Sequence, residues 1–369
     1  MRILVISNMY PSDAAPSFGI FVKNQVEALM NKGNQVDVAA VTNPEAGKKS
    51  ALKKYSKWMW STFRRLRATG RNVDVIHAHY AFPSGVPARM MAKRYGIPYV
   101  VTCHGGDLNK MAQKGRFFRK QTKRILQDAA HVIVVGEDLL QQMLDDFDVP
   151  EDRVSMLSMG VDRRVFHPRP QMDVQEMLEL SPYEKHILYV GNVIEEKGIG
   201  DLLEAFPKVK YELPNARLHV IGPARQEDYL QKLKDRLAEL EVEEAVTFHG
   251  ARSQQEVAEW MAASDLFVLP SHTEGFGLVA VEAMACGTPV VGTNTGGLGR
   301  VLSDGAGAVT EPKHPVSLAE QMAHVLEDRY KRAEMIEKGY EKAAANDAEA
   351  VTDQVLEIYW KAQQRTEKS

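Results

Sequence analysis

The segment Pro270–Gly287 combines two carboxylates with glycines in a pattern suited to an anionic ligand. Its sequence, PSHTEGFGLVAVEAMACG, predicts a strand that ends at Pro270, a glycine-rich loop, and a helix from Leu278. Glycines let the backbone approach a ligand, and the first turn of a helix offers unpaired N–H groups to an anion. Glu274 and Glu282 are eight residues apart, roughly two helical turns. Both are expected to reach one ligand, although two unrelated glutamates on a loop and a helix face explain the spacing equally well.

Three further residues are candidates, although their residue types alone do not separate a functional role from a structural one. Lys197 is a possible phosphate ligand, but a lone lysine is more often a surface residue. His104 could contact a substrate or serve as a capping or core histidine. Gly19 could lie near a ligand or simply form a turn. Each depends on the residues around it in the fold.

Metal-ligating residue types also occur, without a convincing arrangement. His77 and His79 point the same way on a predicted strand, and we interpret them as packing at the strand end rather than as ligands. The acidic run at residues 145–148 lies just before Pro150 and is expected to be solvated at a helix end. We therefore predict no metal site.

Short apolar runs alternate with amphipathic segments along the first half of the chain. This alternation predicts a parallel sheet with helices on both faces. The expected strands are Arg2–Ser7, Gln35–Val41, Asp74–Ala78, Pro98–Thr102 and His131–Val135, and the clearest helices are Ile20–Lys32 and Ser84–Tyr95.

The pattern stops at Phe166–Pro182, where prolines and few apolar residues indicate a linker, and then starts again. The second set of expected strands is His186–Gly191, Ala216–Gly222, Ala245–His249, Leu266–Pro270 and Pro289–Gly292. The expected helices between them are Gly198–Tyr211, Glu227–Leu240, Gln254–Ala263 and Leu278–Cys286. We predict two doubly wound α/β domains, 1–170 and 171–348, with the ligand in the cleft between them.

Length and composition are those of a globular protein of two domains. The chain has 369 residues, of which 44% are hydrophobic and 26% charged, and each half can bury its own core. No secretory segment is recognised, and no apolar stretch approaches the roughly 20 residues that span a membrane. Cys103 and Cys286 have no metal or redox spacing and are expected to be buried thiols. We expect a cytoplasmic protein.

Charge is distributed unevenly along the chain. Residues 1–170 contain 26 Lys and Arg against 15 Asp and Glu, whereas the remainder contain 20 against 34. Lys48–Arg71 has nine basic residues, no acidic ones and interleaved aromatic residues, and Lys110–Arg124 has seven basic residues. Such segments favour an anionic membrane surface, where each basic residue contributes roughly 1 kcal/mol. A basic face of a soluble domain is the alternative, and no nucleic-acid-binding module is recognised.

Five segments resemble, in the correct order, the motifs of the retaining glycosyltransferases of family 4, a large group with the GT-B fold. They are Thr102–Asp107 (His-Gly-x-Asp), Met159–Pro168 (MGVDRRVFHP), Tyr189–Gly198 (YVGNVIEEKG), the two-glutamate segment Pro270–Gly287, and the Gly-Gly loop in Thr293–Gly305. The resemblance implies two Rossmann-like domains, with the C-terminal helix at 349–369 crossing back to the first.

The resemblance also implies roles for individual residues. Glu274 would contact hydroxyls of the transferred sugar, Glu282 the ribose, Lys197 the diphosphate and His104 the sugar from the first domain. The implied donor-binding set is Gly19, Asn192, Lys197, Gly250, Arg252, Glu274, Gly275, Phe276, Gly277, Leu278 and Glu282, and the implied catalytic set is His104, Lys197 and Glu274.

The chain departs from the family pattern at two positions. Asn192 stands where the family usually has an arginine, so neutralisation of the diphosphate depends more on Lys197 and helix N-termini. Arg300 stands where the Gly-Gly loop usually ends in glutamate, which bears on donor preference.

The sequence thus predicts transfer of a hexosyl unit from a nucleotide diphosphate sugar to a hydroxyl, with retention of configuration and no cofactor. The expected acceptor is a lipid-linked glycan or glycolipid at the inner membrane face, as in cell-surface polysaccharide synthesis. Two alternatives remain. One is a nucleotide-sugar epimerase or hydrolase on the same fold, and the other a catalytically silent scaffold that docks on membranes.

Overall fold

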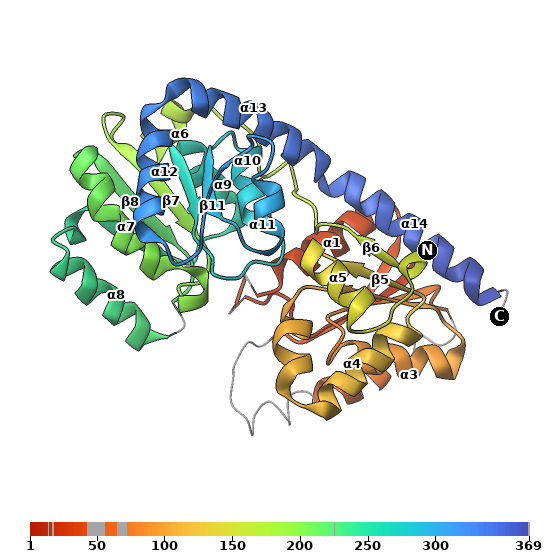
Figure 1. The fold of residues 1–369 in the computed structure, drawn as a ribbon. Coiled ribbons are helices and arrows are strands. Elements are labelled where there is room, and N and C mark those ends of the chain that lie inside the picture. The colour runs from red at the N-terminus through yellow and green to blue at the C-terminus, as the bar shows by residue number, and fades with distance from the viewer. Residues whose placement is uncertain (14, 17, 43–55, 65–71, 225, 368–369) are drawn as a thin grey trace. The chain divides into compact units, whose positions relative to one another are not determined.

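The protein is described by a computed structural model that covers residues 1–13, 15–16, 18–42, 56–64, 72–224 and 226–367 (Figure 1). The chain divides into two compact units. Unit 1 comprises Met1–Gly160 and Ala348–Ser369, and unit 2 comprises Val161–Asp347. The boundary falls before residue 170 because Val161 and Phe166 are buried in a core of unit 2.

Unit 1 is built around six parallel strands in the order β2-β1-β3-β4-β5-β6. Its central strands have the sequences VIHAH and YVVTC and are buried along their whole length, as expected for a parallel sheet covered on both faces. The strands are β1 (Arg2–Ser7), β2 (Gln35–Ala40), β3 (Val75–His79), β4 (Tyr99–Cys103), β5 (His131–Val134) and β6 (Val154–Met156). The labelled helices are α1 (Ile20–Asn31), α3 (Gly85–Tyr95), α4 (Arg116–Asp128), α5 (Glu137–Asp145) and α14 (Ala348–Glu367), and residues 56–64 form another helical segment.

The last helix, α14, packs in the core of unit 1. Its buried residues recur at helical spacing, Val351, Val355, Ile358, Tyr359 and Ala362, which is the pattern of a helix with one apolar face. They cluster with side chains of β1, β3, β4 and β5. The C-terminal helix is therefore part of the first compact unit.

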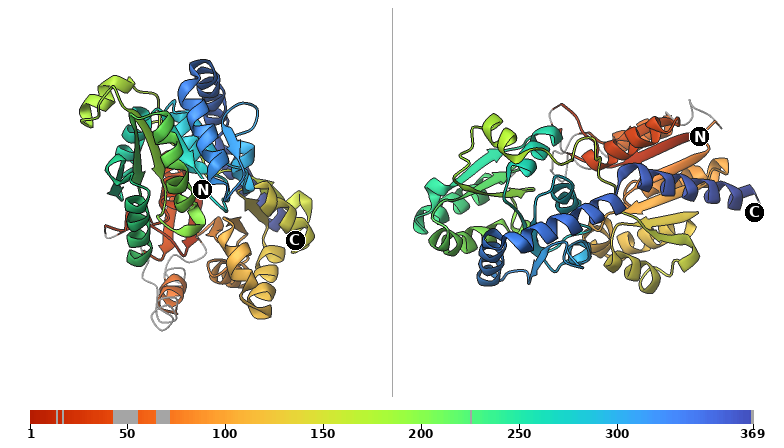
Figure 2. Two further views of the ribbon diagram at one scale, coloured as in Figure 1. Left: turned by 60° about the vertical axis from the view of Figure 1, so that its left-hand side comes forward. Right: turned by 90° about the horizontal axis from the view of Figure 1, so that it is seen from above.

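Unit 2 contains a second parallel sheet of six strands, in the order β12-β11-β10-β7-β8-β9. Alternate strand residues enter different cores: Ile187 and Tyr189 belong to one, and Leu188 to the other. Helices α7 and α12 cover the first face and α9 and α10 the second (Figures 1 and 2). The strands are β7 (Lys185–Val190), β8 (Ala216–Ile221), β9 (Val246–Gly250), β10 (Leu266–Leu269), β11 (Val290–Thr293) and β12 (Ala308–Thr310). The helices are α6 (Gln171–Met177), α7 (Ile199–Glu212), α8 (Glu227–Glu239), α9 (Gln254–Ala263), α10 (Leu278–Ala285), α11 (Gly296–Val301), α12 (Pro315–Glu327) and α13 (Arg329–Ala345).

The interpretation of Phe166–Pro182 as a linker is wrong, because the segment contains helix α6 and packs against unit 2. Val174 is buried, and the side-chain amides of Gln171 and Gln175 donate to the carbonyl of Ala263 at 3.2 and 2.9 Å. So short a helix, anchored by glutamines, has little apolar periodicity to reveal it.

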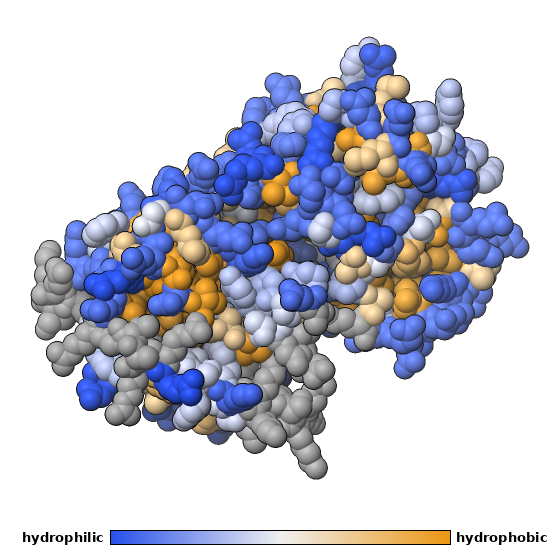
Figure 3. Space-filling model, turned by 180° about the vertical axis from the view of Figure 1, so that it is seen from behind, coloured by the Kyte–Doolittle hydropathy of each residue, from blue (hydrophilic) through white to orange (hydrophobic). Residues whose placement is uncertain are grey.

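The surface drawn in Figure 3 is mainly hydrophilic, with hydrophobic residues in separate patches. Two of the large exposed apolar side chains belong to unit 1, Trp60 and Phe117, each 64% exposed. Within the described residues, no helix combines the length and the apolar character needed to cross a bilayer.

Candidate active site

The two loops of chief interest follow the central strands of unit 2. Strands β7 and β10 are neighbours, and the chain proceeds from β7 towards β8 on one side and from β10 towards β11 on the other. Ligands of such sheets bind beyond the carboxyl ends of the strands, where the strand order reverses. The β7–α7 loop (Gly191–Gly198) and the β10–α10 loop (Pro270–Gly277) lie at this point.

Lys197 and Glu274 meet there as an ion pair. The ammonium nitrogen Nζ of Lys197 is 2.6 Å from Oε2 of Glu274, and the two side chains are 26% and 15% exposed. The hydroxyl of Ser271 donates to the same oxygen at 3.1 Å, and the N–H of Gly275 donates to Oε1 at 3.2 Å. The pair is partly desolvated and still accessible. Ser271 was not predicted, because a serine after a strand has no distinguishing signal.

Close backbone packing brings the two loops together. Gly198 adopts a left-handed conformation with φ of 67°, and a Cβ atom there would lie 1.8 Å from the carbonyl oxygen of Pro270. Any other residue would push the loops apart. Gly198 also immediately follows Lys197, so this contact helps to fix the lysine beside Glu274.

Glu282 lies on α10, one turn beyond the start of the helix at Leu278. It is partly buried, and burial raises the pKa of its carboxyl group to about 8. Residues Phe276 to Leu278 lead into the same helix, whose first N–H groups have no partner within the helix. A carboxyl group with a raised pKa close to such a helix start is a candidate functional group.

Three other predicted donor-binding residues lie at the same edge of the unit 2 sheet. Asn192 is exposed at the end of β7, and its backbone carbonyl accepts the hydroxyl of Tyr189 at 2.9 Å. Gly250 ends β9, which is separated from β7 by β8. Arg252 follows it, exposed and 3.7 Å from Glu256. These residues share the edge with Lys197 without a described contact to the Lys197–Glu274 pair.

His104 and Gly19 belong to unit 1, where they lie beyond the carboxyl ends of β4 and β1. Gly19 begins α1 with φ of 74°, and a Cβ atom there would lie 2.7 Å from the backbone of Met9. The Nε2 atom of His104 is 3.2 Å from Nδ1 of His79, and its ring contacts those of Phe21 and Tyr80. Burial lowers the pKa of His104 to about 3. The ring is therefore neutral near pH 7 and can exchange hydrogen bonds without bringing charge.

Asp107 organises this edge of unit 1. One carboxylate oxygen accepts the backbone N–H of Ala81 at 2.8 Å, and the other accepts that of His104 at 3.2 Å. Asp107 is 1% exposed, and burial raises the pKa of its carboxyl group. The aspartate thereby links the segments that follow β3 and β4. Its place in the His-Gly-x-Asp element was recognised in the sequence, but its partner Ala81 was not.

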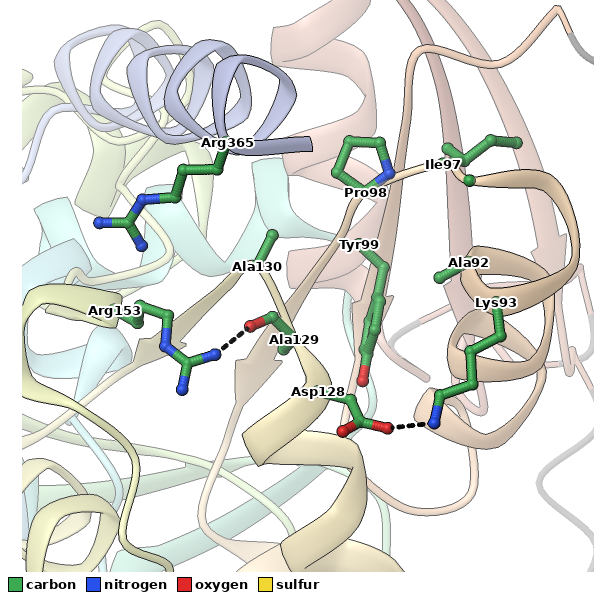
Figure 4. Close-up of a pocket in the computed structure, with 11 residues that line it drawn as sticks. Ala92, Lys93, Ile97, Pro98, Tyr99, Asp128, Ala129, Ala130, Arg153 and Arg365 are labelled. Atoms are coloured by element: carbon green, nitrogen blue, oxygen red, sulfur yellow. Dashed lines mark hydrogen bonds and ion pairs between the residues drawn. The ribbon is translucent and has the colours of Figure 1, made fainter. Parts of the chain in front are cut away.

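A pocket at the opposite edge of the unit 1 sheet has less to offer a ligand (Figure 4). It lies at the amino ends of β4 and β5, and the cations around it already have partners. Lys93 pairs with Asp128 at 2.8 Å, Arg153 donates to two backbone carbonyls, and Arg365 pairs with Asp152 at 2.8 Å. The carboxyl edge of each sheet is therefore a better candidate for ligand binding than this pocket.

The predicted basic segments are only partly described. Of Lys48–Arg71, residues 48–55 and 65–71 lie outside the described residues; in the remainder, Arg64 stacks over Trp60 at 5.3 Å. Lys110–Arg124 reaches into α4, where Arg119 pairs with Asp146 and Lys123 with Asp148. Part of the positive charge of α4 is therefore balanced locally. Among the described side chains, no group of three or more His, Cys, Asp or Glu is placed to hold a metal ion.

Comparisons with known proteins identify the family to which the chain belongs. The pattern of the family described as Glycosyl transferases group 1 matches residues 174–342, and that of Glycosyltransferase Family 4 matches residues 19–165. TuaC of Bacillus subtilis, a glycosyltransferase named for teichuronic acid biosynthesis, is 28% identical over 94% of both chains. The D-inositol 3-phosphate glycosyltransferase of Frankia alni is 31% identical, covering 78% of this chain and 74% of its own.

Solved structures support the same fold. HepE of Anabaena, crystallised with UDP and glucose, superimposes with a TM-score of 0.78 over 97% of this chain and 98% of its own, at 20% identity. The two parallel sheets match the expected GT-B architecture. The chain therefore belongs to the group 1 glycosyltransferases of the family 4 type, and it is a glycosyltransferase with the GT-B fold.

Proposed function

We infer that the protein transfers a hexosyl unit from a nucleotide diphosphate sugar to a hydroxyl acceptor, with retention of anomeric configuration. The observation that carries this proposal is the Lys197–Glu274 ion pair, 2.6 Å long, at the strand-order reversal of unit 2. A cation, a carboxylate and the N-terminus of α10 all lie at this edge of the sheet. These are the groups that a diphosphate joined to a sugar requires.

Each group then has a specific task. The diphosphate is bound by Lys197 and by the backbone N–H groups of Phe276, Gly277 and Leu278. Glu274 accepts hydrogen bonds from hydroxyl groups of the sugar. The ammonium group of Lys197 stabilises the diphosphate more strongly as the bond between the anomeric carbon and the phosphate oxygen breaks, because negative charge develops on the leaving group.

The nucleoside is held further along the same edge. Glu282 accepts ribose hydroxyls, and the base lies beside Gly250 and Arg252 at the end of β9. A carboxylate that binds sugar hydroxyls also serves as the ribose ligand in dinucleotide-binding sheets. Asn192 supplies a hydrogen bond without charge, which leaves Lys197 as the main neutralising group.

Unit 1 supplies the remaining contacts. Gly19 permits close approach of backbone to phosphate, and the neutral His104 hydrogen-bonds to the transferred sugar. The acceptor hydroxyl attacks from the face that the diphosphate leaves. Its proton passes to the leaving phosphate oxygen as the new glycosidic bond forms, so no enzyme carboxylate forms a covalent intermediate.

We also propose a lipid-linked glycan or glycolipid as acceptor, at the inner face of a membrane. Support comes from the basic first half of the chain and from the exposed Phe117 on α4, which lies among exposed Arg116, Lys120 and Arg124. Aromatic and basic residues together favour an anionic bilayer surface. The relationship to TuaC supports an acceptor of the cell-surface polymer kind.

A panel of nucleotide sugars tests the proposal: UDP-glucose, UDP-galactose, UDP-N-acetylglucosamine, GDP-mannose and ADP-glucose. We expect one of them to raise the melting temperature, and Glu282→Ala to lose that rise. The selected donor should release nucleoside diphosphate when a lipid-linked acceptor is added in anionic vesicles, and NMR of the product should show retained configuration.

Other outcomes would separate the alternatives. Release of free sugar or of an epimer without acceptor would identify a hydrolase or an epimerase. Vesicle binding without any response to the panel would favour a silent scaffold. An inverted product would contradict the proposed mechanism, and equal activity on neutral vesicles or on a soluble acceptor would contradict the membrane assignment.

A further inference from the structure

The loops that carry Lys197 and Glu274 are joined by a second polar contact between side chains. The ring nitrogen Nε2 of His272 lies 2.7 Å from Oδ2 of Asp201. His272 belongs to the β10–α10 loop, two residues before Glu274, and Asp201 lies in the first turn of α7, four residues after Lys197. The contact therefore runs parallel to the Lys197–Glu274 pair.

Partial burial and a neighbouring backbone hydrogen bond strengthen this contact. The two side chains are only 17% and 23% exposed, and a hydrogen bond to a carboxylate is stronger where water is partly excluded. The backbone N–H of His272 also donates to the carbonyl of Glu196 at 3.0 Å. His272 is thus attached to both ends of the segment that contains Lys197, by its backbone before the lysine and by its ring after it.

Binding of the nucleotide-sugar donor would affect the two parallel contacts differently. In the proposed function, Lys197 turns towards the diphosphate and Glu274 towards the sugar, so their mutual contact is shared with the ligand. His272 and Asp201 have no such task. Their bond can persist unchanged through binding and transfer.

We propose that His272 and Asp201 are positioning residues that set the separation of Lys197 and Glu274 during sugar transfer. This inference rests on the proposed function, which assigns the diphosphate to Lys197 and the sugar to Glu274. Without the bond, the two loops keep their backbone contacts, and the side chains that touch the donor lose their alignment. Small displacements of such groups reduce the reaction rate more than they weaken binding of the ground state.

The test uses the full-length protein and the donor selected by the panel above. His272→Leu and Asp201→Ala each remove the bond, and we expect each to lower kcat on the order of 10-fold while KM for the donor changes less than about threefold. His272→Gln keeps an N–H donor near the position of Nε2 and should recover most of kcat. Asp201→Asn keeps an acceptor and should also remain close to wild type.

A double variant and a matched control complete the design. His272→Leu/Asp201→Ala should be no slower than either single variant, since both remove the same interaction. Lys185→Met removes another partly buried ion pair of unit 2, Lys185–Asp265 at 3.2 Å, and should leave kcat unchanged. Melting temperatures of all variants separate loss of alignment from loss of folding.

The outcomes distinguish the two levels of the proposal. Failure of the wild-type protein to transfer any sugar of the panel would contradict the proposed function and this inference with it. Normal transfer by wild type together with normal kcat in His272→Leu would overturn the positioning role alone. So would equal losses in His272→Leu and His272→Gln, or multiplicative losses in the double variant.

Discussion

The carboxyl edges of the two sheets have related topologies and opposite chemistry. In both units the strand order reverses once, between β1 and β3 in unit 1 and between the two central strands β7 and β10 in unit 2. At the edge of unit 1 aromatic rings lie together, and the ring of His104 contacts those of His79 and Tyr80. The edge of unit 2 gathers charge in the pair of Lys197 and Glu274.

Burial explains the difference in charge. Desolvation lowers the pKa of His104 to about 3 and that of His79 well below its ordinary value, so these two rings are neutral near pH 7. In unit 2 each charged partner compensates the desolvation of the other. Two sheets of one fold type thus carry different side chains at their carboxyl edges, neutral rings in unit 1 and a charged pair in unit 2, and the proposed roles rest on this difference rather than on the fold.

The strongest way to break this comparison is to remove the charge of unit 2. We expect Lys197→Ala to lower kcat on the order of 100- to 1,000-fold, because the diphosphate loses its main neutralising group as it leaves. Steady-state transfer assays with the selected donor measure this. Lys208→Ala is the matched control, since Lys208 lies on an exposed part of α7 and pairs with Glu320 of α12. Transfer at the wild-type rate by Lys197→Ala would remove the reason for calling the unit 2 edge a diphosphate site.

A smaller effect is expected from the neutral histidines of unit 1. Burial lowers the pKa of His77 to about 3, against about 6.5 in an unfolded chain. The unfolded state therefore takes up the proton first, and the stability contributed by neutral His77 is present above about pH 6.5 and lost as the pH falls towards 3. By pH 5 the loss is about 2 kcal/mol for this residue. Its ring faces the hydroxyls of Tyr359 and Thr102 and the ring of His79.

Denaturant unfolding at pH 7 and pH 5 checks this expectation, with amide exchange to follow unit 1 separately. His77→Gln should reduce the difference in unfolding free energy between the two pH values by about 2 kcal/mol. Glu282→Gln in unit 2 should act in the opposite sense, because a raised carboxyl pKa makes acidification stabilising. If the difference were the same in wild type and His77→Gln, the buried histidine would not be the titrating group.

Local sequence patterns and ordered motifs were enough for the fold class, which the sheets confirm, and for the family, which the comparisons confirm. They were not enough for contacts made across the fold. Lys197 and Glu274 are 77 residues apart, and His272 and Asp201 are 71 apart. Both members of the first pair lie in motifs that indicate a functional site, whereas Asp201 lies outside them. The assigned roles of these residues stay predictions.

The contacts that sequence reasoning missed depend on tertiary packing. The hydroxyl of Tyr359 on α14 lies 2.6 Å from Nδ1 of His77, across 282 residues, and no periodicity can indicate that pairing. Edge strands β6 and β12 have three residues each, too few for an apolar run to be recognised. Helix α6 was missed because its glutamines bind a carbonyl of another helix.

The smallest expected effect is also the finest distinction between the two edges, a dependence of nucleotide affinity on pH. With a pKa of about 8, the ionised fraction of Glu282 rises roughly tenfold between pH 7 and pH 9. Ribose hydroxyls donate to the ionised form, so affinity for the nucleoside diphosphate of the selected donor should rise by up to about tenfold over this range. Titration calorimetry measures it. Glu282→Gln should flatten the profile, whereas His104→Phe should retain it, because burial keeps the pKa of His104 near 3. If His104→Phe also flattened the profile, the titrating group would not be Glu282 alone, and the contrast between neutral rings in unit 1 and charged groups in unit 2 would fail.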